Sequence, residues 1–310
     1  MNLQQLIEQY LTYRKAMGWR IPANGGRLGR FSRIVGGSAD ITDVRPEQVQ
    51  AFLAGAGPIT RTWHNKYSAL RCFYRYAISR GYVSTAPLPS IVPPRPPSIV
   101  PYIYSREELR RILQAADTVR RLRGCLEPVT MRTAILLLYG AGLRLQEALN
   151  LNQTDVDFEG SLLTIRHTKF LKTRLVPFGP QLGQVLGRYI QSRTRSTELP
   201  VFTTRTGGRI KQRAILNHFR VICKQAGVRR TDSTRYQPRL HDLRHAFAVH
   251  RLTSWYQQGA DVQKLLPQLS TYLGHVYLKD TQVYLTMTSE LLCEARNRFG
   301  KYAGQEGCHE

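Results

Sequence analysis

The chain has 310 residues, enough for two domains that each bury a hydrophobic core. Its 45 Lys and Arg residues outnumber 21 Asp and Glu residues, and the resulting charge of +24 is spread along the whole sequence. Such a charge indicates a polyanionic partner, most often nucleic acid. The hydrophobic content of 42% argues against the disordered basic tails of many ribosomal proteins.

The five cysteines form no Cys-x-x-Cys pair, which favours reduced thiols in a cytoplasmic protein over a zinc knuckle or a disulfide framework. The N-terminal segment is amphipathic and lacks the continuous apolar core of a signal peptide. No apolar run approaches the length of a membrane span, so the sequence predicts no membrane partner.

Residues 1–85 are predicted to form a small helical domain. Apolar residues at helical spacing indicate helices over 2–17 and 59–80, and Pro46 begins another, PEQVQAFLAG. Gly-rich turns are expected at 25–30 and 36–37. Basic residues, among them Lys66, surround the apolar stripe of the 59–80 helix; a solvated face explains them as well as nucleic-acid binding does.

Residues 86–101 form the clearest boundary in the sequence. Seven of the fifteen residues from Pro87 to Pro101 are prolines, which predicts an extended, semi-rigid linker. A partner that recognises PPRPP is a weaker interpretation, because a linker explains the run without one.

Residues 102–300 are predicted to form a second domain of mixed α+β type, followed by a polar tail at 301–310. Ser105 and Glu108 form a capping box, and an apolar helix over 128–139 is expected at the centre. Alternating segments at 161–166 and 173–178 predict a β-hairpin whose turn carries Lys169 and Lys172. Helices are expected near 180–193, 211–226 and 289–302. The fold class is therefore mainly α with a small β-hairpin, in two domains.

Residues 239–285 carry groups that are suited to attack a phosphodiester without a metal. His241 and Arg244 are three residues apart and share one face of a helix. His275 follows a Gly that suits a helix end, and Tyr284 lies nine residues later. An Arg fork grips a phosphate, a His donates to it or moves a proton, and a Tyr hydroxyl is a nucleophile.

Each of these residues also has a less specific interpretation. His241 and His245 have the His-x-x-x-His spacing of a zinc helix, but the expected third ligand position holds Arg251. His241 alone suits a helix cap or a core, and Arg144 suits an ion pair with Glu147 on the same helix. Several cationic groups and a Tyr at turns and helix starts of one basic domain favour a shared site over separate explanations.

The second domain resembles the tyrosine recombinases, the integrase family that includes the Xer proteins and phage integrases. The resembling segments are AGLRLQEAL, TKFLKTRLVPFG, RLHDLRH, LSTYLGH and TQVYL, in the family's order. Carried over residue by residue, the resemblance implies the catalytic set Arg144, Lys169, His241, Arg244, His275 and the nucleophile Tyr284. Lys172 is the alternative catalytic lysine, and Tyr256, Tyr272 and Tyr277 are the competing tyrosines. No family role is assigned to His245.

The resemblance implies strand cleavage through a 3′-phosphotyrosyl link, with the phenol proton passing by way of His241. One ester replaces another, so no ATP, metal or other cofactor is expected. Residues 1–85 are similar to a core-binding domain, and no arm-binding domain is visible. The implied partners are double-stranded DNA with inverted-repeat core sites and three further protomers, of the same or a related recombinase, during integration, excision or resolution of a mobile element. The alternatives are a type IB topoisomerase and a DNA-binding regulator that never cleaves.

Overall fold

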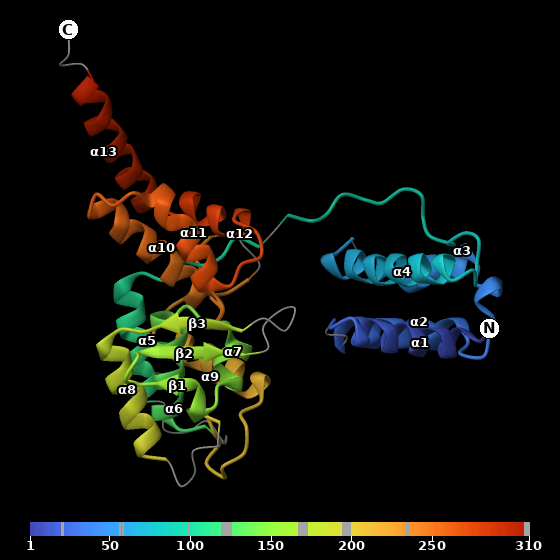
Figure 1. The fold of residues 1–310 in the computed structure, drawn as a ribbon, viewed down its shortest axis with the longest axis horizontal. Helices are drawn as coiled ribbons and strands as arrows, with labels where there is room; N and C mark the ends of the chain where they lie inside the picture. The colour runs from blue at the N-terminus through green and yellow to red at the C-terminus, as the bar shows by residue number, and fades with distance from the viewer. Residues whose placement is uncertain are drawn as a thin grey trace. The chain divides into compact units, whose positions relative to one another are not determined.

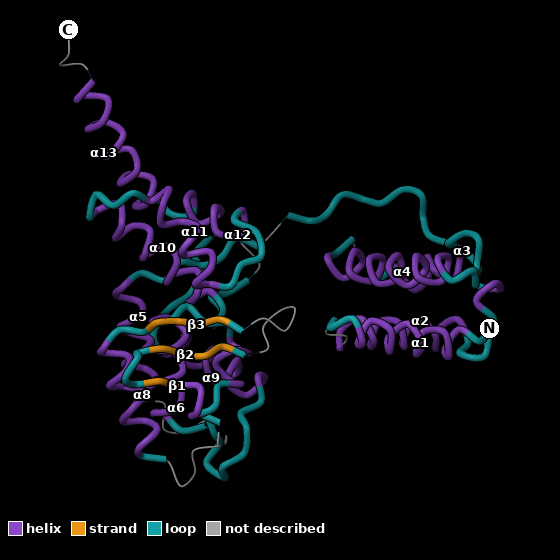
Figure 2. The backbone as a smooth tube through the Cα atoms, viewed as in Figure 1, coloured by secondary structure: helices purple, strands orange, loops and turns teal. Residues whose placement is uncertain are grey.

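The computed structural model describes residues 1–19, 22–55, 57, 59–97, 99–118, 126–166, 173–193, 200–232 and 236–306 (Figure 1). The chain is mainly helical with one small antiparallel sheet, which confirms the predicted fold class (Figure 2). Contacts divide it into a unit comprising Met1–Ile99 and a unit that begins at Val100, and each has its own hydrophobic core. Among the described residues, no helix is both long and apolar enough to cross a membrane.

The first unit packs its helices around a core of aromatic and aliphatic side chains. Phe31, Phe52, Leu70 and Phe73 are buried there. Pro46 occupies the first turn of its helix, as predicted. The helices are α1 (Leu3–Ala16), α2 (Pro22–Val35), α3 (Pro46–Leu53) and α4 (Arg61–Ser79), with a short 3-10 turn η1 (Ile41–Asp43).

Helix α2 corrects the prediction of a Gly-rich turn at 25–30. Leu28 and Phe31, three residues apart, are both fully buried, so the segment presents an apolar face at helical spacing. A Cβ at Gly26 or Gly29 would meet nothing within 4 Å, so these glycines lie on an open face. Burial of the apolar face outweighs the helix penalty of roughly 1 kcal/mol per glycine.

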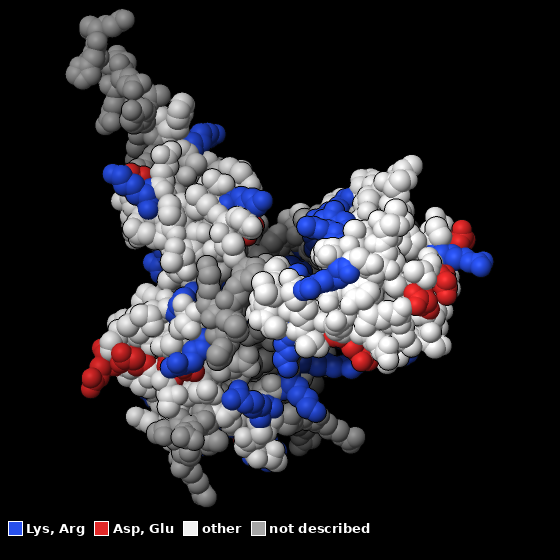
Figure 3. All heavy atoms as spheres, turned by 45° about the vertical axis from the view of Figure 1, so that its right-hand side comes forward, with Lys and Arg blue, Asp and Glu red and all other residues white. Residues whose placement is uncertain are grey.

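Lys66 has a structural partner instead of belonging to a free basic face. Its ammonium donates to the carbonyl oxygens of Phe52 at 2.6 Å and Ala54 at 3.3 Å, at the end of α3. The carbonyls at a helix end lack partners within the helix, so this lysine ties α4 to α3. On the face drawn in Figure 3, Lys and Arg side chains are present on both units, and Asp and Glu side chains cover a smaller part of the surface.

The second unit is built around the apolar helix α6. Residues Ser105 and Glu108 form the predicted capping box, each side chain accepting the other's backbone N–H. Helix α6 contacts α5, α8 and α10 on its several sides. The elements up to the sheet and beyond it are α5 (Arg106–Thr118), α6 (Pro128–Gly140), α7 (Leu145–Asn150), η2 (Gln153–Asp155), α8 (Pro180–Gln191) and α9 (Gln212–Gln225).

The sheet contains β1 (Val156–Asp157), β2 (Leu162–Ile165) and β3 (Arg174–Pro177), in that order and antiparallel. The pairing of Leu163 with Val176, both fully buried, sets the register of the predicted hairpin. Strand β1 is an addition that the sequence pattern did not predict, since two residues are too short to show alternation. The hairpin turn, with Lys169 and Lys172, lies outside the described residues.

The C-terminal helices form a separate hydrophobic cluster that supports the site. They are α10 (Asp242–Gln257), α11 (Val262–Leu273), α12 (Lys279–Gln282), the 3-10 helix η4 (Val283–Thr286) and α13 (Ser289–Glu306). Phe247, Leu273 and Leu291 are buried together with Tyr284 in this cluster. The packing fixes the end of α11 and the start of α10 against the α6–α7 turn.

Candidate active site

A tight turn between α6 and α7 positions Arg144. Gly142 has a φ of +57°, and a Cβ there would lie 2.6 Å from the ring of Phe247, so glycine is required. Arg144 directly precedes α7, and its guanidinium donates to Glu147 at 2.8 Å and to the carbonyl of Gly274 at 3.0 Å. The ion pair of the alternative interpretation is therefore present. It holds an arginine whose side chain remains 36% exposed and able to reach a ligand.

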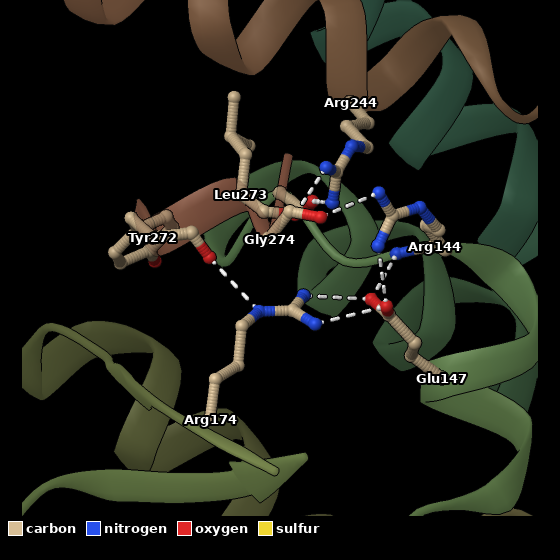
Figure 4. A network of polar contacts seen from close by, with 8 residues as sticks. Arg144, Glu147, Arg174, Arg244, Tyr272, Leu273 and Gly274 are labelled. Atoms are coloured by element: carbon tan, nitrogen blue, oxygen red, sulfur yellow. Dashed lines mark hydrogen bonds and ion pairs between the residues drawn. The ribbon is translucent and has the colours of Figure 1, made fainter. Parts of the chain in front are cut away.

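Glu147 is shared between two arginines (Figure 4). Arg174 on β3 donates to its two carboxylate oxygens at 2.9 and 2.8 Å and to the carbonyl of Tyr272 at 3.0 Å. Burial alone would raise the pKa of Glu147, but the hydrogen bonds and charges of Arg174 and Arg144 outweigh it and lower the pKa to about 2. The carboxylate therefore stays ionised and fixes both guanidinium groups.

The last turn of α11 and the residue after it hold three arginines by their main chain (Figure 4). The carbonyl oxygens of Tyr272, Leu273 and Gly274 accept hydrogen bonds from Arg174, Arg244 and Arg144 in turn. Carbonyls at a helix C-terminus have no partner within the helix and carry a partial negative charge. The carbonyl acceptors are neutral and the three guanidinium groups share one carboxylate, that of Glu147, so a net positive charge remains, as an anion site requires.

Arg244 is the most deeply buried of these arginines, with 2% of its surface exposed. Its guanidinium donates to the carbonyl of Gly142 at 2.7 Å as well as to Leu273. Burial, followed by the nearby charge of Arg144, lowers its pKa to about 10, so it remains charged at neutral pH. The turn after α6 and the end of α11 are thus joined by one side chain from α10.

His275 directly follows the helix end that anchors the arginines. Gly274 ends α11 in the left-handed region, with a φ of 67°, and turns the chain so that His275 enters the site. The Nδ1 atom of His275 lies 2.7 Å from the hydroxyl of Thr281, which is fully buried. Burial and the charges of Arg244 and Arg144 lower the pKa of His275 to about 4, so the imidazole is neutral at pH 7.

Tyr284 lies in η4, against His275 and His245. Its ring stacks on His275 with a centroid distance of 6.1 Å, and its hydroxyl is 3.0 Å from Nδ1 of His245. The side chain is 2% exposed. Burial raises the pKa of the phenol, and the charges of Arg244 and Arg144 oppose that rise. The nucleophile expected from the sequence is therefore next to two of the expected arginines and one expected histidine.

His241 precedes α10 on the exposed side of the site. Its ring meets the ring of His245 edge-on, with a centroid distance of 5.0 Å. Loss of hydration and the charge of Arg244 lower its pKa. The resemblance to tyrosine recombinases implies that His241 helps to move the proton of the phenol, whereas the hydroxyl of Tyr284 is hydrogen-bonded to His245.

The competing tyrosines have other surroundings. Tyr272 donates its hydroxyl to the carbonyl of Pro177 at 3.1 Å and stacks on Phe247. Tyr277 is 61% exposed, and Tyr256 packs on the edge of the C-terminal cluster. Within the described ranges, no group of three His, Cys, Asp or Glu residues has the geometry to hold a metal ion.

The match to a family model covers residues 104–290, described as the phage integrase family. The chain belongs to the phage integrase family. Within it, the chain is 36% identical to an integrase/recombinase of Sinorhizobium fredii, y4rB, over 309 residues and 96% of both chains. It is 29% identical to tyrosine recombinase XerA of Thermococcus onnurineus, over 96% of this chain and 95% of that one. This phage integrase is a tyrosine recombinase, an enzyme of site-specific recombination; the topoisomerase and regulator alternatives are not favoured.

Solved structures share the fold of this phage integrase. The Tn1549 transposon integrase bound to circular intermediate DNA superposes with a TM-score of 0.68, at 17% identity, over 97% of this chain and 99% of that one. A lambda integrase tetramer bound to a Holliday junction superposes with a TM-score of 0.65, at 14% identity, over 92% of this chain and 77% of that one. At these identities the likeness establishes the fold of the recombinase alone.

The sequence does not predict the place of three residues in this site. Arg174 belongs to the strand motif RLVP, Glu147 is predicted only as a local ion-pair partner, and the resemblance implies no role for His245. The one available signal for Glu147 was its place one turn after Arg144. Arg174 and His245 meet their partners 27 and 39 residues away along the chain, so no local pattern indicates these contacts.

Proposed function

We propose that this recombinase cleaves and rejoins DNA strands through a 3′-phosphotyrosyl link at Tyr284. The observation that carries the proposal is the convergence of separate segments. Arg144 and Arg244 reach consecutive carbonyls at the end of α11, and His275 follows directly. The ring of Tyr284 stacks on that same histidine. Two guanidinium groups, an imidazole and a phenol thus lie close together at the end of α11, in a strongly basic chain.

In the proposed reaction, Arg144, Arg244, His241 and His275 bind the scissile phosphate and stabilise the charge of a pentavalent transition state. The Tyr284 hydroxyl gives its proton to a histidine of the site as its oxygen bonds to phosphorus. The bond from phosphorus to the 5′ oxygen breaks, and that oxygen takes a proton from Lys169 or, alternatively, Lys172. One phosphoester replaces another, so the exchange is nearly balanced in energy. The chemistry needs neither ATP nor a metal ion.

The proposed substrate is double-stranded DNA with inverted-repeat core sites, bound by four copies of the chain or by copies of it with a related recombinase. Residues 1–85 act as the core-binding domain, 86–101 as the linker and 102–300 as the catalytic domain, with a polar tail at 301–310. The net charge of +24 and the DNA-bound states of the Tn1549 and lambda integrases support this proposal. The proposed role is integration, excision or resolution of a mobile element in the cytoplasm.

The test is covalent capture. Fragments of the DNA that flanks the gene are incubated with the protein, and those that stay attached after denaturation identify the site. A nicked duplex of that site then traps the intermediate, because the short strand beyond the nick diffuses away after cleavage.

Each outcome separates one function from another. A covalent adduct together with strand exchange between two duplexes supports a recombinase. An adduct with relaxation of supercoils and no exchange indicates a topoisomerase. Binding without an adduct on any flanking fragment overturns the proposal and indicates a regulator.

A further inference from the structure

We propose that His245 is the general base of strand cleavage: its Nδ1 atom takes the phenolic proton of Tyr284 as the tyrosyl–phosphorus bond forms. The inference rests on the proposed function and assigns a residue to its proton transfer. The proton passes from the Tyr284 oxygen to Nδ1, the oxygen bonds to phosphorus, and the departing 5′ oxygen takes a different proton from the catalytic lysine. In religation the proton returns from Nδ1 to the phenolate.

The geometry carries the proposal. The Tyr284 oxygen and Nδ1 of His245 are 3.0 Å apart, within the range in which a base takes a proton directly. The residues come from α10 and η4, which pack together around buried Phe247 and Leu291. With 2% of its side chain exposed, Tyr284 has little access to a water molecule as an alternative acceptor. The hydrogen bond thus joins α10 to η4 at the C-terminal hydrophobic cluster, close to Arg244.

His241 is less well placed for this role. Its ring contacts the edge of the His245 imidazole and lies on the exposed side, at the start of α10. From there it suits a hydrogen bond to the phosphate itself. We therefore assign the two histidines different tasks: His241 faces the substrate and His245 faces the nucleophile.

The surroundings of His245 keep its imidazole in the neutral form, with a lone pair free for a proton, and at the same time lower its basicity. Burial and the proximity of His241 lower its pKa to about 4, with Arg239 and Arg244 acting in the same direction and Asp242 opposing them. The imidazole is therefore neutral at pH 7. A bound phosphodiester adds negative charge beside it, which raises the affinity of the imidazole for a proton at the moment when the phenol must lose one.

The decisive variant is His245→Asn. The side-chain amide of Asn occupies about the same position as Nδ1 of His. It can therefore keep a hydrogen bond to Tyr284, but it does not take up a proton. The matched control is His250→Asn on the same helix, since Nδ1 of His250 also meets a tyrosine hydroxyl, that of Tyr139, at 2.8 Å. Both variants are tested as the full chain, with single-turnover cleavage of the captured nicked duplex, DNA affinity and thermal unfolding.

We expect His245→Asn to bind DNA like the wild type and to cleave about 10²–10⁴ times more slowly, the usual contribution of a general base. His250→Asn should cleave at close to the wild-type rate. If His245→Asn cleaves within about threefold of the control, the histidine only positions the phenol, and the proposal is overturned. Failure of the wild type itself to form an adduct would refute the proposed function instead, so the two failures are distinguishable.

A second measurement needs no change at position 245, in case His245→Asn unfolds. Fluorotyrosine at position 284 lowers the pKa of the nucleophile. If His245 is the base, the cleavage rate falls at low pH as the imidazole becomes protonated, and the pH of half-maximal rate is the same with tyrosine and with fluorotyrosine. If the phenol must ionise by itself, the pH of half-maximal rate is lower with fluorotyrosine. Such a shift of the pH of half-maximal rate overturns the assignment.

Discussion

Among the three arginines held by the carbonyls at the end of α11, Arg144 has the most exposed side chain. We predict that Arg144→Ala lowers the rate of cleavage by a hundredfold or more, because loss of one such donor costs roughly 3 kcal/mol in the transition state. DNA affinity should change little, since the chain has 45 Lys and Arg residues and the loss of one leaves its net positive charge almost unchanged. Single-turnover cleavage and gel shifts measure the two effects.

The control for Arg144→Ala is Arg110→Ala. Arg110 lies on α5 with 68% of its side chain exposed and a comparable ion pair, to Glu107. Equal cleavage rates for the two variants would show that the Arg144 side chain does not contribute to the chemistry.

Tyr284→Phe removes one oxygen and keeps the ring that stacks on His275. We predict that this variant folds and binds DNA but forms no covalent adduct on the nicked duplex. Tyr277→Phe is the control, because Tyr277 is nearby in sequence and exposed to solvent. Mass spectrometry of a digested wild-type adduct should find the nucleotide on the peptide that contains Tyr284; attachment at Tyr272 or Tyr277 would disprove the assignment.

The sequence was informative about residues that occur in short motifs. Arg144, His241, Arg244, His275 and Tyr284 each lie within a segment whose neighbours resemble a family pattern, and the fold brings these segments together. The supporting partners depend on distant contacts. Thr281 cannot be predicted as the partner of His275, because the turn after α11 brings the two together and the sequence contains many other hydroxyl groups.

At the scale of elements, the Glu147–Arg174 pair joins α7 to β3 and makes the unit sensitive to acid. The pKa of Glu147 is about 2 in the folded chain against an ordinary value of 4.5. A lowered folded-state pKa stabilises the protein above the unfolded-state value, and the stabilisation is lost as the pH falls from about 5 towards 2. The difference corresponds to about 3 kcal/mol at neutral pH.

We therefore predict that Glu147→Gln is less stable than the wild type at pH 7 and that the gap narrows as the pH is lowered to 3. Denaturant unfolding at a series of pH values measures both curves. Asp117→Asn, at an exposed ion pair with Arg132, is the control and should show little change in the gap. If the difference in unfolding free energy between the variant and the wild type does not change with pH, the arginines do not lower the pKa of Glu147.

The elements themselves were predictable where a pattern was long. The apolar stripe of α4, the capping box of α5 and the β2–β3 hairpin follow from periodicity and local chemistry. Helix α2 was not predictable in this way, because its glycines indicate a turn and only the burial of Leu28 and Phe31 reveals the helix. Strand β1 exists because β2 offers it an edge, which is a property of the assembled sheet.

At the scale of the whole molecule, the charge of +24 predicts a strong dependence of DNA binding on salt. Each neutralised phosphate contributes about 0.9 to the slope of log affinity against log salt concentration, so a clamp on six phosphates gives a slope of roughly −5. Gel shifts over a salt series measure it. A slope near zero would contradict backbone binding by this chain.

Strand cleavage should also be independent of divalent metals, because the proposed chemistry uses side chains alone. We predict an unchanged rate of adduct formation after dialysis against EDTA. A preparation that regains lost activity with zinc or magnesium would contradict this mechanism and direct attention back to the spacing of His241 and His245.

The end of α11 has a consequence for how substitutions combine. Three adjacent carbonyl oxygens hold Arg144, Arg174 and Arg244, and the left-handed conformation of Gly274 fixes their direction. A shift of this one turn displaces all three guanidinium groups together, so the energetic effects of damaging any of them are coupled rather than additive. The geometry of the three guanidinium groups is therefore a joint property of this turn, and no one of them is positioned independently of the other two.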